Sequence, residues 1–145
     1  MKATYSFEDY QLVFEKKETC LLPTLVDDIR EIDRNKIHYR LDHQNTVPLN
    51  YGLFDEDALV VDHLTSRSVR LIDPLGKGIR VDFPDYSMLG VWTIRGKQAP
   101  YLCIEPWQGT CAYVDVENKM EAKAGVQRLP PWASRSHRAV VSIEE

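Results

Sequence analysis

The chain has 145 residues, of which 43% are hydrophobic and 28% are charged, and its formal net charge is −4. This length and composition are typical of a folded protein, and we expect residues 1–145 to form a single domain. The composition excludes a disordered tail, and no apolar run approaches the roughly 18 residues that a membrane-spanning helix needs. We therefore expect no membrane partner.

The charged residues are interspersed, whereas a nucleic-acid-binding surface needs a basic stripe, so we expect no nucleic-acid partner. The first residues lack the apolar segment of a signal peptide. The cysteines are odd in number and include no C-x-x-C spacing; they are Cys20, Cys103 and Cys111. Such a set argues against a disulfide framework or a zinc site and indicates a cytoplasmic location.

Alternation of apolar and polar residues with a period of two dominates the chain and predicts β-strands. In residues 10–15, for example, Tyr10, Leu12 and Phe14 share one face. Turn signals that contain Gly, Pro or Asp separate these segments. Alternation predicts strands at residues 10–15, 67–71 and 79–83, and short apolar runs predict further strands at 58–61, 89–92, 101–104 and 139–143. Many short strands with frequent turns favour a mainly β fold, an antiparallel sandwich or barrel.

Residues 24–41 fit two different structures. Thr24 is a possible helix N-cap. Three apolar residues after it have the spacing of one helix face, namely Leu25, Ile29 and Ile32. The same stretch also fits a pair of strands that turn around Asn35 and Lys36. We favour the strand pair, because period-two alternation dominates the chain.

The string CIEPWQG at residues 103–109 places an acid at the end of an apolar strand. Pro106 favours an extended Glu105 and cannot donate to a central ladder. We therefore expect the strand to end there, with Glu105 at its C-terminal end. A carboxylate in such partly desolvated surroundings suits a general base. The alternative is a structural glutamate that pairs with an arginine.

Trp92 and Trp107 are candidates for sugar binding, because aromatic faces stack on the apolar faces of sugar rings. Large aromatic residues in a β-rich chain also serve as core, and spacing alone does not decide between these roles.

Three acids precede the strand expected at 58–61, namely Asp55, Glu56 and Asp57. They could bind sugar hydroxyls or a metal, although a solvated turn is the simpler explanation. The four histidines lack the H-x-x-H and H-x-x-x-H spacings of metal ligands; they are His38, His43, His63 and His137. A basic segment from Arg128 to Arg138 could contact a phosphate or a carboxylate, and we expect it at the surface.

Several strings, taken in order, give the chain a resemblance that none of them carries alone. They are FEDY at residues 7–10, PLNYGLF at 48–54, DAL at 57–59, GIRVDFP at 78–84, LGVW at 89–92 and CIEPWQG at 103–109. In this order they resemble the C-terminal half of the aldose 1-epimerase, or galactose mutarotase-like, family, and most of all its LacX-like branch. The LGVW and EPW strings are the most specific.

The resemblance implies an antiparallel β-sandwich of the galactose mutarotase type, present as its C-terminal half. It implies an isomerase that interconverts the anomers of a free aldohexose or derivative by general acid–base catalysis, with no cofactor. Glu105 matches the family's catalytic base. Asp57 would correspond to a sugar-hydroxyl ligand, and Trp92 and Trp107 would line the cleft, so all three are expected to bind substrate.

The resemblance also predicts what the chain lacks. Family members are much longer, and their acid is a histidine just upstream of the string that matches residues 7–10. No histidine precedes Phe7 here. We therefore expect a truncated enzyme that pairs with a missing N-terminal half or associates with itself through open sheet edges. A non-catalytic carbohydrate-binding or regulatory module is the alternative function.

Overall fold

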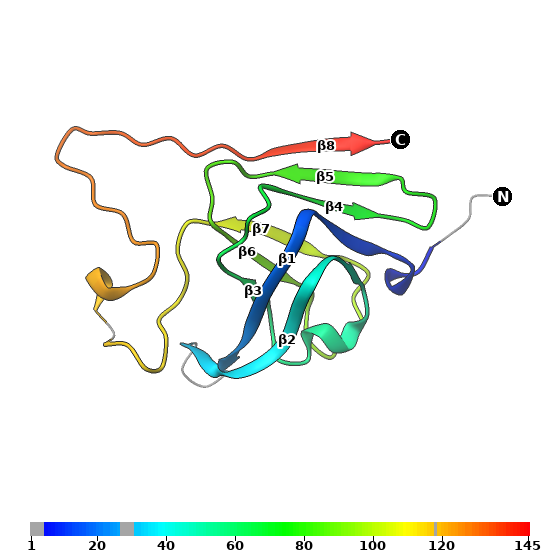
Figure 1. Cartoon of the computed structure of the whole chain (residues 1–145), viewed down its shortest axis with the longest axis horizontal. Coiled ribbons are helices and arrows are strands. Elements are labelled where there is room, and N and C mark those ends of the chain that lie inside the picture. The colour runs from blue at the N-terminus through cyan, green and yellow to red at the C-terminus, as the bar shows by residue number, and fades with distance from the viewer. Residues whose placement is uncertain (1–4, 27–30, 118) are drawn as a thin grey trace.

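Two antiparallel sheets make up the fold, and the computed structural model describes residues 5–26, 31–117 and 119–145. The strands are β1 (Gln11–Val26), β2 (Glu31–Pro48), β3 (Leu59–Val61), β4 (Ser68–Ile72), β5 (Gly78–Asp82), β6 (Met88–Trp92), β7 (Cys103–Trp107) and β8 (Val140–Glu144). Three short 3-10 helices are η1 (Phe7–Asp9), η2 (Tyr51–Phe54) and η3 (Met120–Ala122). The strand orders are β2-β1-β4-β5-β8 and β3-β6-β7 (Figure 1). Within the described ranges, no helix is long and apolar enough to cross a membrane.

Every segment that the sequence predicts as a strand contains one, which confirms the mainly β, antiparallel prediction. The helix considered at the start of residues 24–41 is wrong, because Thr24 lies buried in β1 and Leu25 pairs with Ile32 of β2. The expected extended structure is confirmed, but the expected pairing across Asn35 and Lys36 is wrong, because Ile37 and Leu41 pair with residues of β1. Asn35 and Lys36 both lie inside β2, which already begins at Glu31. Ile29 lies outside the described residues.

The core lies between the two sheets. Leu12 and Phe14 of β1 and Val69 of β4 pack in one buried cluster with Leu89 and Val91 of β6. Each is at most 3% exposed. Full burial of such a side chain contributes about 1.5–3 kcal/mol, so this layer is the main source of stability for the fold.

The core-facing side of the five-stranded sheet extends beyond the area that the second sheet covers. Phe14 pairs with Val69, Val69 with Val81, and Val81 with Val141, so the four side chains share one face. The first three are buried, whereas Val141 on the edge strand β8 is 66% exposed and its neighbour Ile143 is 82% exposed. The apolar face therefore continues into solvent at β8, the outermost strand in Figure 1.

Glu18 is a buried carboxylate that fastens β1 to the loop between β3 and β4. It is 2% exposed and accepts hydrogen bonds from the backbone N–H and the hydroxyl of both Thr65 and Ser66. Burial alone would raise the pKa of this carboxyl group, but the four hydrogen bonds outweigh burial and lower its pKa below the ordinary value. The β1–β2 register shifts on both sides of Glu18, so this bond network holds an irregular point of the strand.

Replacing Glu18 by alanine is expected to lower the free energy of unfolding by about 3 kcal/mol, because the buried donors of Ser66 lose their acceptor and two hydrogen bonds from the exposed Thr65 are lost as well. The stabilisation by Glu18 should be fully present above its unfolded-state pKa, near 4.5, and be lost as the pH falls through its lower folded-state value. Denaturant unfolding at neutral and acid pH measures both effects. Glu121→Ala, at an exposed glutamate of η3, is the matched control. Equal stability of Glu18→Ala and the wild type at neutral pH would contradict this role.

Candidate active site

Strands β6 and β7 bring two tryptophans and a glutamate onto one face of the three-stranded sheet. In their antiparallel ladder, Gly90 lies opposite Glu105 and Trp92 lies opposite Cys103. Directly opposite residues project from the same face, as do residues two apart along a strand. Trp107 therefore also lies on the face of Glu105.

The strand does not end at Glu105, so that expectation is wrong. β7 continues through Pro106, which pairs with Leu89, to Trp107. Proline is tolerated here because β7 is the edge strand of its sheet, where a missing N–H need not interrupt a ladder. Glu105 therefore lies within the strand and is partly buried, rather than at the strand's C-terminal end.

The carboxylate of Glu105 accepts a hydrogen bond from each tryptophan. Trp92 Nε1 donates to Oε1 at 2.9 Å, and Trp107 Nε1 donates to Oε2 at 3.1 Å. A carboxylate offers about four acceptor positions, so each oxygen keeps capacity for a further donor. The arrangement holds the carboxylate from two strands and leaves it able to accept a proton.

Gly90 makes room for one of these indoles. A Cβ atom at Gly90 would lie 2.4 Å from Cζ2 of Trp107, closer than such atoms approach in proteins. The ring of Trp107 therefore lies directly over the backbone of Gly90, and from there its Nε1 reaches Glu105. Any larger residue at position 90 would have to displace the ring.

Trp92 and Trp107 line a hollow of about 430 Å³ that also includes Asp57, Leu25 and Arg95. This volume is in the range of small-molecule sites, roughly 300–1,000 Å³. The structure thus brings together Asp57 and the two tryptophans, which the sequence singled out separately.

Asp57 is held in an uncommon backbone conformation, with a φ of +74°. Aspartate adopts this left-handed region more readily than most residues. Its Oδ1 accepts a hydrogen bond from the backbone N–H of Ala58 at 2.7 Å. The other two acids of this segment do not line the hollow: Asp55 follows η2, and Glu56 lies 3.5 Å from Lys36. In the described residues, no group of three or more His, Cys, Asp or Glu could hold a metal ion.

The histidines lie elsewhere. His38 Nε2 is 2.7 Å from the carbonyl oxygen of Leu53, and His63 Nε2 is 2.9 Å from Asp62. His137, in the basic segment, is bonded to the carbonyl oxygen of Asp85 at 3.2 Å. The lining of the hollow at the two tryptophans includes none of the four histidines.

The basic segment from Arg128 to Arg138 is exposed, and a phosphate or carboxylate contact there stays a prediction.

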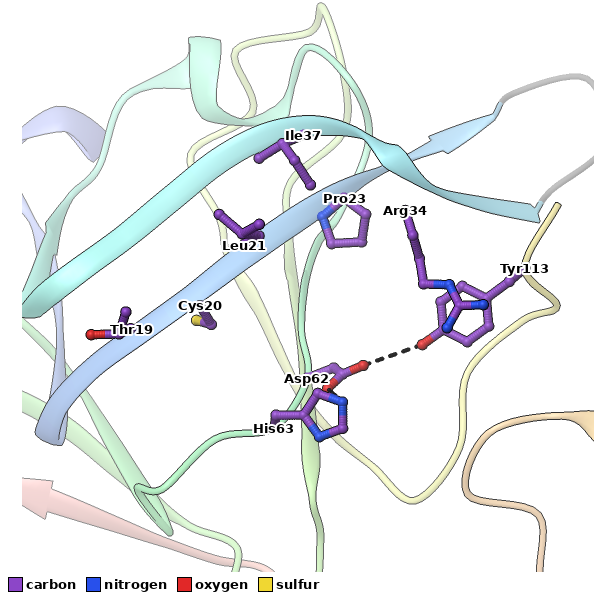
Figure 2. Close-up of a pocket in the computed structure, with 9 residues that line it drawn as sticks. All are labelled: Thr19, Cys20, Leu21, Pro23, Arg34, Ile37, Asp62, His63 and Tyr113. Atoms are coloured by element: carbon purple, nitrogen blue, oxygen red, sulfur yellow. Dashed lines mark hydrogen bonds and ion pairs between the residues drawn. The ribbon is translucent and has the colours of Figure 1, made fainter. Parts of the chain in front are cut away.

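A second hollow, of about 320 Å³, was not indicated by the sequence. It is lined by Thr19, Cys20, Leu21, Pro23, Arg34, Ile37, Asp62, His63 and Tyr113 (Figure 2). The Tyr113 hydroxyl donates to Asp62 Oδ2 at 3.2 Å, and the Arg34 guanidinium lies 4.3 Å from the centre of the Tyr113 ring. Burial raises the pKa of the Cys20 thiol to about 11 and that of the Tyr113 hydroxyl to about 12, so both stay protonated at neutral pH. Neither is an activated nucleophile.

Solved structures define the class to which this fold belongs. A galactose mutarotase related enzyme from Lactobacillus acidophilus matches 100% of this chain and 48% of its own, with a TM-score of 0.80 and 22% sequence identity. A galactose mutarotase-like protein from Lactobacillus casei matches 99% of this chain and 49% of its own, with a TM-score of 0.67 and 22% identity. The fold is thus a galactose mutarotase-like β-sandwich, present as about half of the longer chains.

The sequence identifies a more specific relationship. The LacX proteins of Lactococcus lactis subsp. lactis, one plasmid-borne and one chromosomal, are 36% identical to this chain over 126 residues. The matched region is 86% of this chain and 42% of LacX. No protein-family model matches the chain. The chain is therefore a LacX homologue that spans less than half of LacX, which confirms the resemblance inferred from the strings. That it corresponds to the C-terminal half stays a prediction.

Substituting Gly90 by alanine is expected to displace Trp107 and lower the free energy of unfolding by about 1–3 kcal/mol, as overpacking does. Near-ultraviolet circular dichroism should show the loss of the ordered tryptophan environment. Gly76→Ala is the control: a Cβ there meets nothing within 4 Å, although its φ of +80° is strained for alanine. That variant should lose about 1 kcal/mol with an unchanged tryptophan spectrum. An unchanged spectrum in Gly90→Ala would contradict the packing described above.

Proposed function

We propose that this chain carries the base and part of the sugar-binding surface of an aldose 1-epimerase site. The observation that supports this best is the Glu105 carboxylate, held by two indoles whose rings line a hollow with Asp57. Glu105 is the base, Asp57 binds a sugar hydroxyl, and the tryptophan faces contact the apolar face of the ring. The relationship to LacX and the fold shared with a galactose mutarotase related enzyme support an aldohexose substrate.

The reaction moves protons and opens one bond. Glu105 accepts the proton of the anomeric hydroxyl while an acid protonates the ring oxygen, and the bond between the anomeric carbon and that oxygen breaks. Rotation about the C1–C2 bond of the open aldehyde, followed by the reverse steps, delivers either anomer. Each positioned proton-transfer group typically contributes about 10²–10⁴-fold to the rate.

The acid comes from outside the described residues. No histidine of this chain lines the hollow beside Trp92 and Trp107, and the hollow opens between β1, the segment before β3 and the segment after β6. The proposed partner is therefore a polypeptide segment that supplies the acid and closes the site. The L. acidophilus structure has more than half of its chain outside the match, which is enough to supply such a segment.

The same segment would cover the open apolar face at β8. On the core-facing side, Ile79 pairs with the largely exposed Ile143. On the opposite side, Arg80 is paired with Asp82, and Arg70 with Glu144. One face of these strands is thus charged and suited to water, whereas the other face is apolar and remains exposed at β8. An exposed apolar patch of this kind marks an interaction surface.

The chain alone is expected to leave the mutarotation of galactose or glucose at the rate of buffer, because it supplies a base without its acid. Polarimetry of a freshly dissolved anomer measures the rate. Glu105→Gln should be indistinguishable from the wild type in this assay. An acceleration by the wild type that Glu105→Gln abolishes would contradict the half-site proposal and show a self-sufficient enzyme.

A non-catalytic carbohydrate-binding module is the second candidate, because the hollow has aromatic faces and no histidine. Calorimetric titration with aldohexoses separates the two. Binding that survives Glu105→Gln but weakens at least about tenfold, or 1.4 kcal/mol, in Trp107→Ala would favour the module. Binding that needs the Glu105 carboxylate favours the base-bearing half-site.

The uncovered face is expected to make the isolated chain associate with itself. Ile143→Glu should reduce this association, because it places a charge on the apolar face. Ser142→Glu is the matched control, since Ser142 is exposed, is adjacent in β8 and pairs with Arg80 on the charged face. Light scattering over a concentration series measures the average mass. A wild-type chain that stays monomeric throughout would count against an interaction surface at β8.

A further inference from the structure

We infer that Trp92 and Trp107 are positioning residues for Glu105 through their N–H edges, and not only aromatic walls for a sugar. The three side chains form an indole clamp, defined as Trp92, Glu105 and Trp107. The indole clamp is a pair of hydrogen bonds in the sugar-free protein. Its role in catalysis rests on the proposed function, in which Glu105 is the base.

The clamp fixes the carboxylate at both oxygens. The donor to Oε1 comes from β6 and the donor to Oε2 comes from β7, so the two bonds tie the carboxylate to neighbouring strands. A glutamate side chain has a broadly distributed terminal torsion, and donors on both oxygens remove that freedom. A base oriented before substrate arrives needs no reorganisation during the reaction.

The clamp changes which part of each tryptophan can meet a ligand. Both N–H groups are already engaged by Glu105, so they are not available to sugar hydroxyls while the clamp is intact. Contact of either indole with a ligand in the hollow would then be made by ring atoms other than Nε1. Hydroxyl recognition then falls to Asp57 and to the remaining lone pairs of Glu105.

The chain contains its own reference for a test. Trp132, the third tryptophan, is fully exposed, with a relative accessibility of 102%. In a ¹H–¹⁵N spectrum of the sugar-free chain, we expect two indole N–H signals shifted downfield and slow to exchange with water, and one at the position of a free indole. Substitutions Trp92→Phe, Trp107→Phe and Trp132→Phe assign the three signals.

Removing the acceptor should release both site signals together. In Glu105→Ala, both should move toward the Trp132 signal and exchange with water at least about tenfold faster. Glu121→Ala, at an exposed glutamate, should change neither. Signals of Trp92 and Trp107 that stay in place in Glu105→Ala would overturn the clamp.

Single indole substitutions keep the inference testable if Glu105→Ala fails to fold. Trp92→Phe keeps an aromatic ring and removes one donor, so the Trp107 signal should stay shifted, because its own bond is to the other oxygen. Free-indole behaviour of Trp107 in the folded wild type would overturn the clamp. These spectra contain no sugar, so failed sugar binding or mutarotation would count against the proposed function and leave the clamp standing.

Discussion

Glu18 lies at an irregular point of β1, and its four hydrogen bonds tie this strand to the loop between β3 and β4. β1 pairs with β4 only as far as Phe14, and beyond the register shifts it continues along β2 while packing against β3. β3 in turn pairs with β6, the strand that carries Gly90 and Trp92. The Glu18 carboxylate, held by Thr65 and Ser66, therefore ties β1 to the loop that follows β3, and β3 belongs to the sheet that carries the candidate site.

The contacts of Glu18 with residues far along the chain illustrate why the sequence predicts one part of the fold and not another. Segment 79–83 is predictable because its apolar and polar residues alternate with a period of two, and 89–92 is predictable as a short apolar run, since both faces of β6 are largely buried. Alternation fails along β1 after residue 15, at Lys16, Lys17 and Glu18, so the pattern did not predict that the strand continues there. Glu18 is in fact buried, but the donors that make this possible lie far along the chain. The local alternation of apolar and polar residues gives no information about hydrogen-bond donors so distant in the sequence.

The candidate site, too, was predictable from the sequence only in part. The family resemblance assigned Asp57, Trp92, Glu105 and Trp107 to a sugar site. In the structure Asp57 and the two tryptophans line one hollow, and Glu105, which is not among its lining residues, is bonded to both indoles. The hydrogen bonds between them depend on the β6–β7 register, which a sequence pattern does not specify. Pro106 was misjudged for a related reason: its effect on a strand depends on whether that strand lies at an edge. The hollow at Tyr113 joins segments far apart in the chain, so no short string could have marked it.

Gly90 has a consequence for how this group of proteins can change over time. The glycine, the tryptophan over it and the glutamate between the strands are three parts of one contact, although they belong to two separate strings of sequence. A side chain at position 90 needs Trp107 to move or to be replaced by something smaller, and in either case the hydrogen bond from Trp107 to the carboxylate is disturbed. We expect these positions to vary as a set among homologues. Where the glycine is lost, a different way of holding the acid should have taken its place.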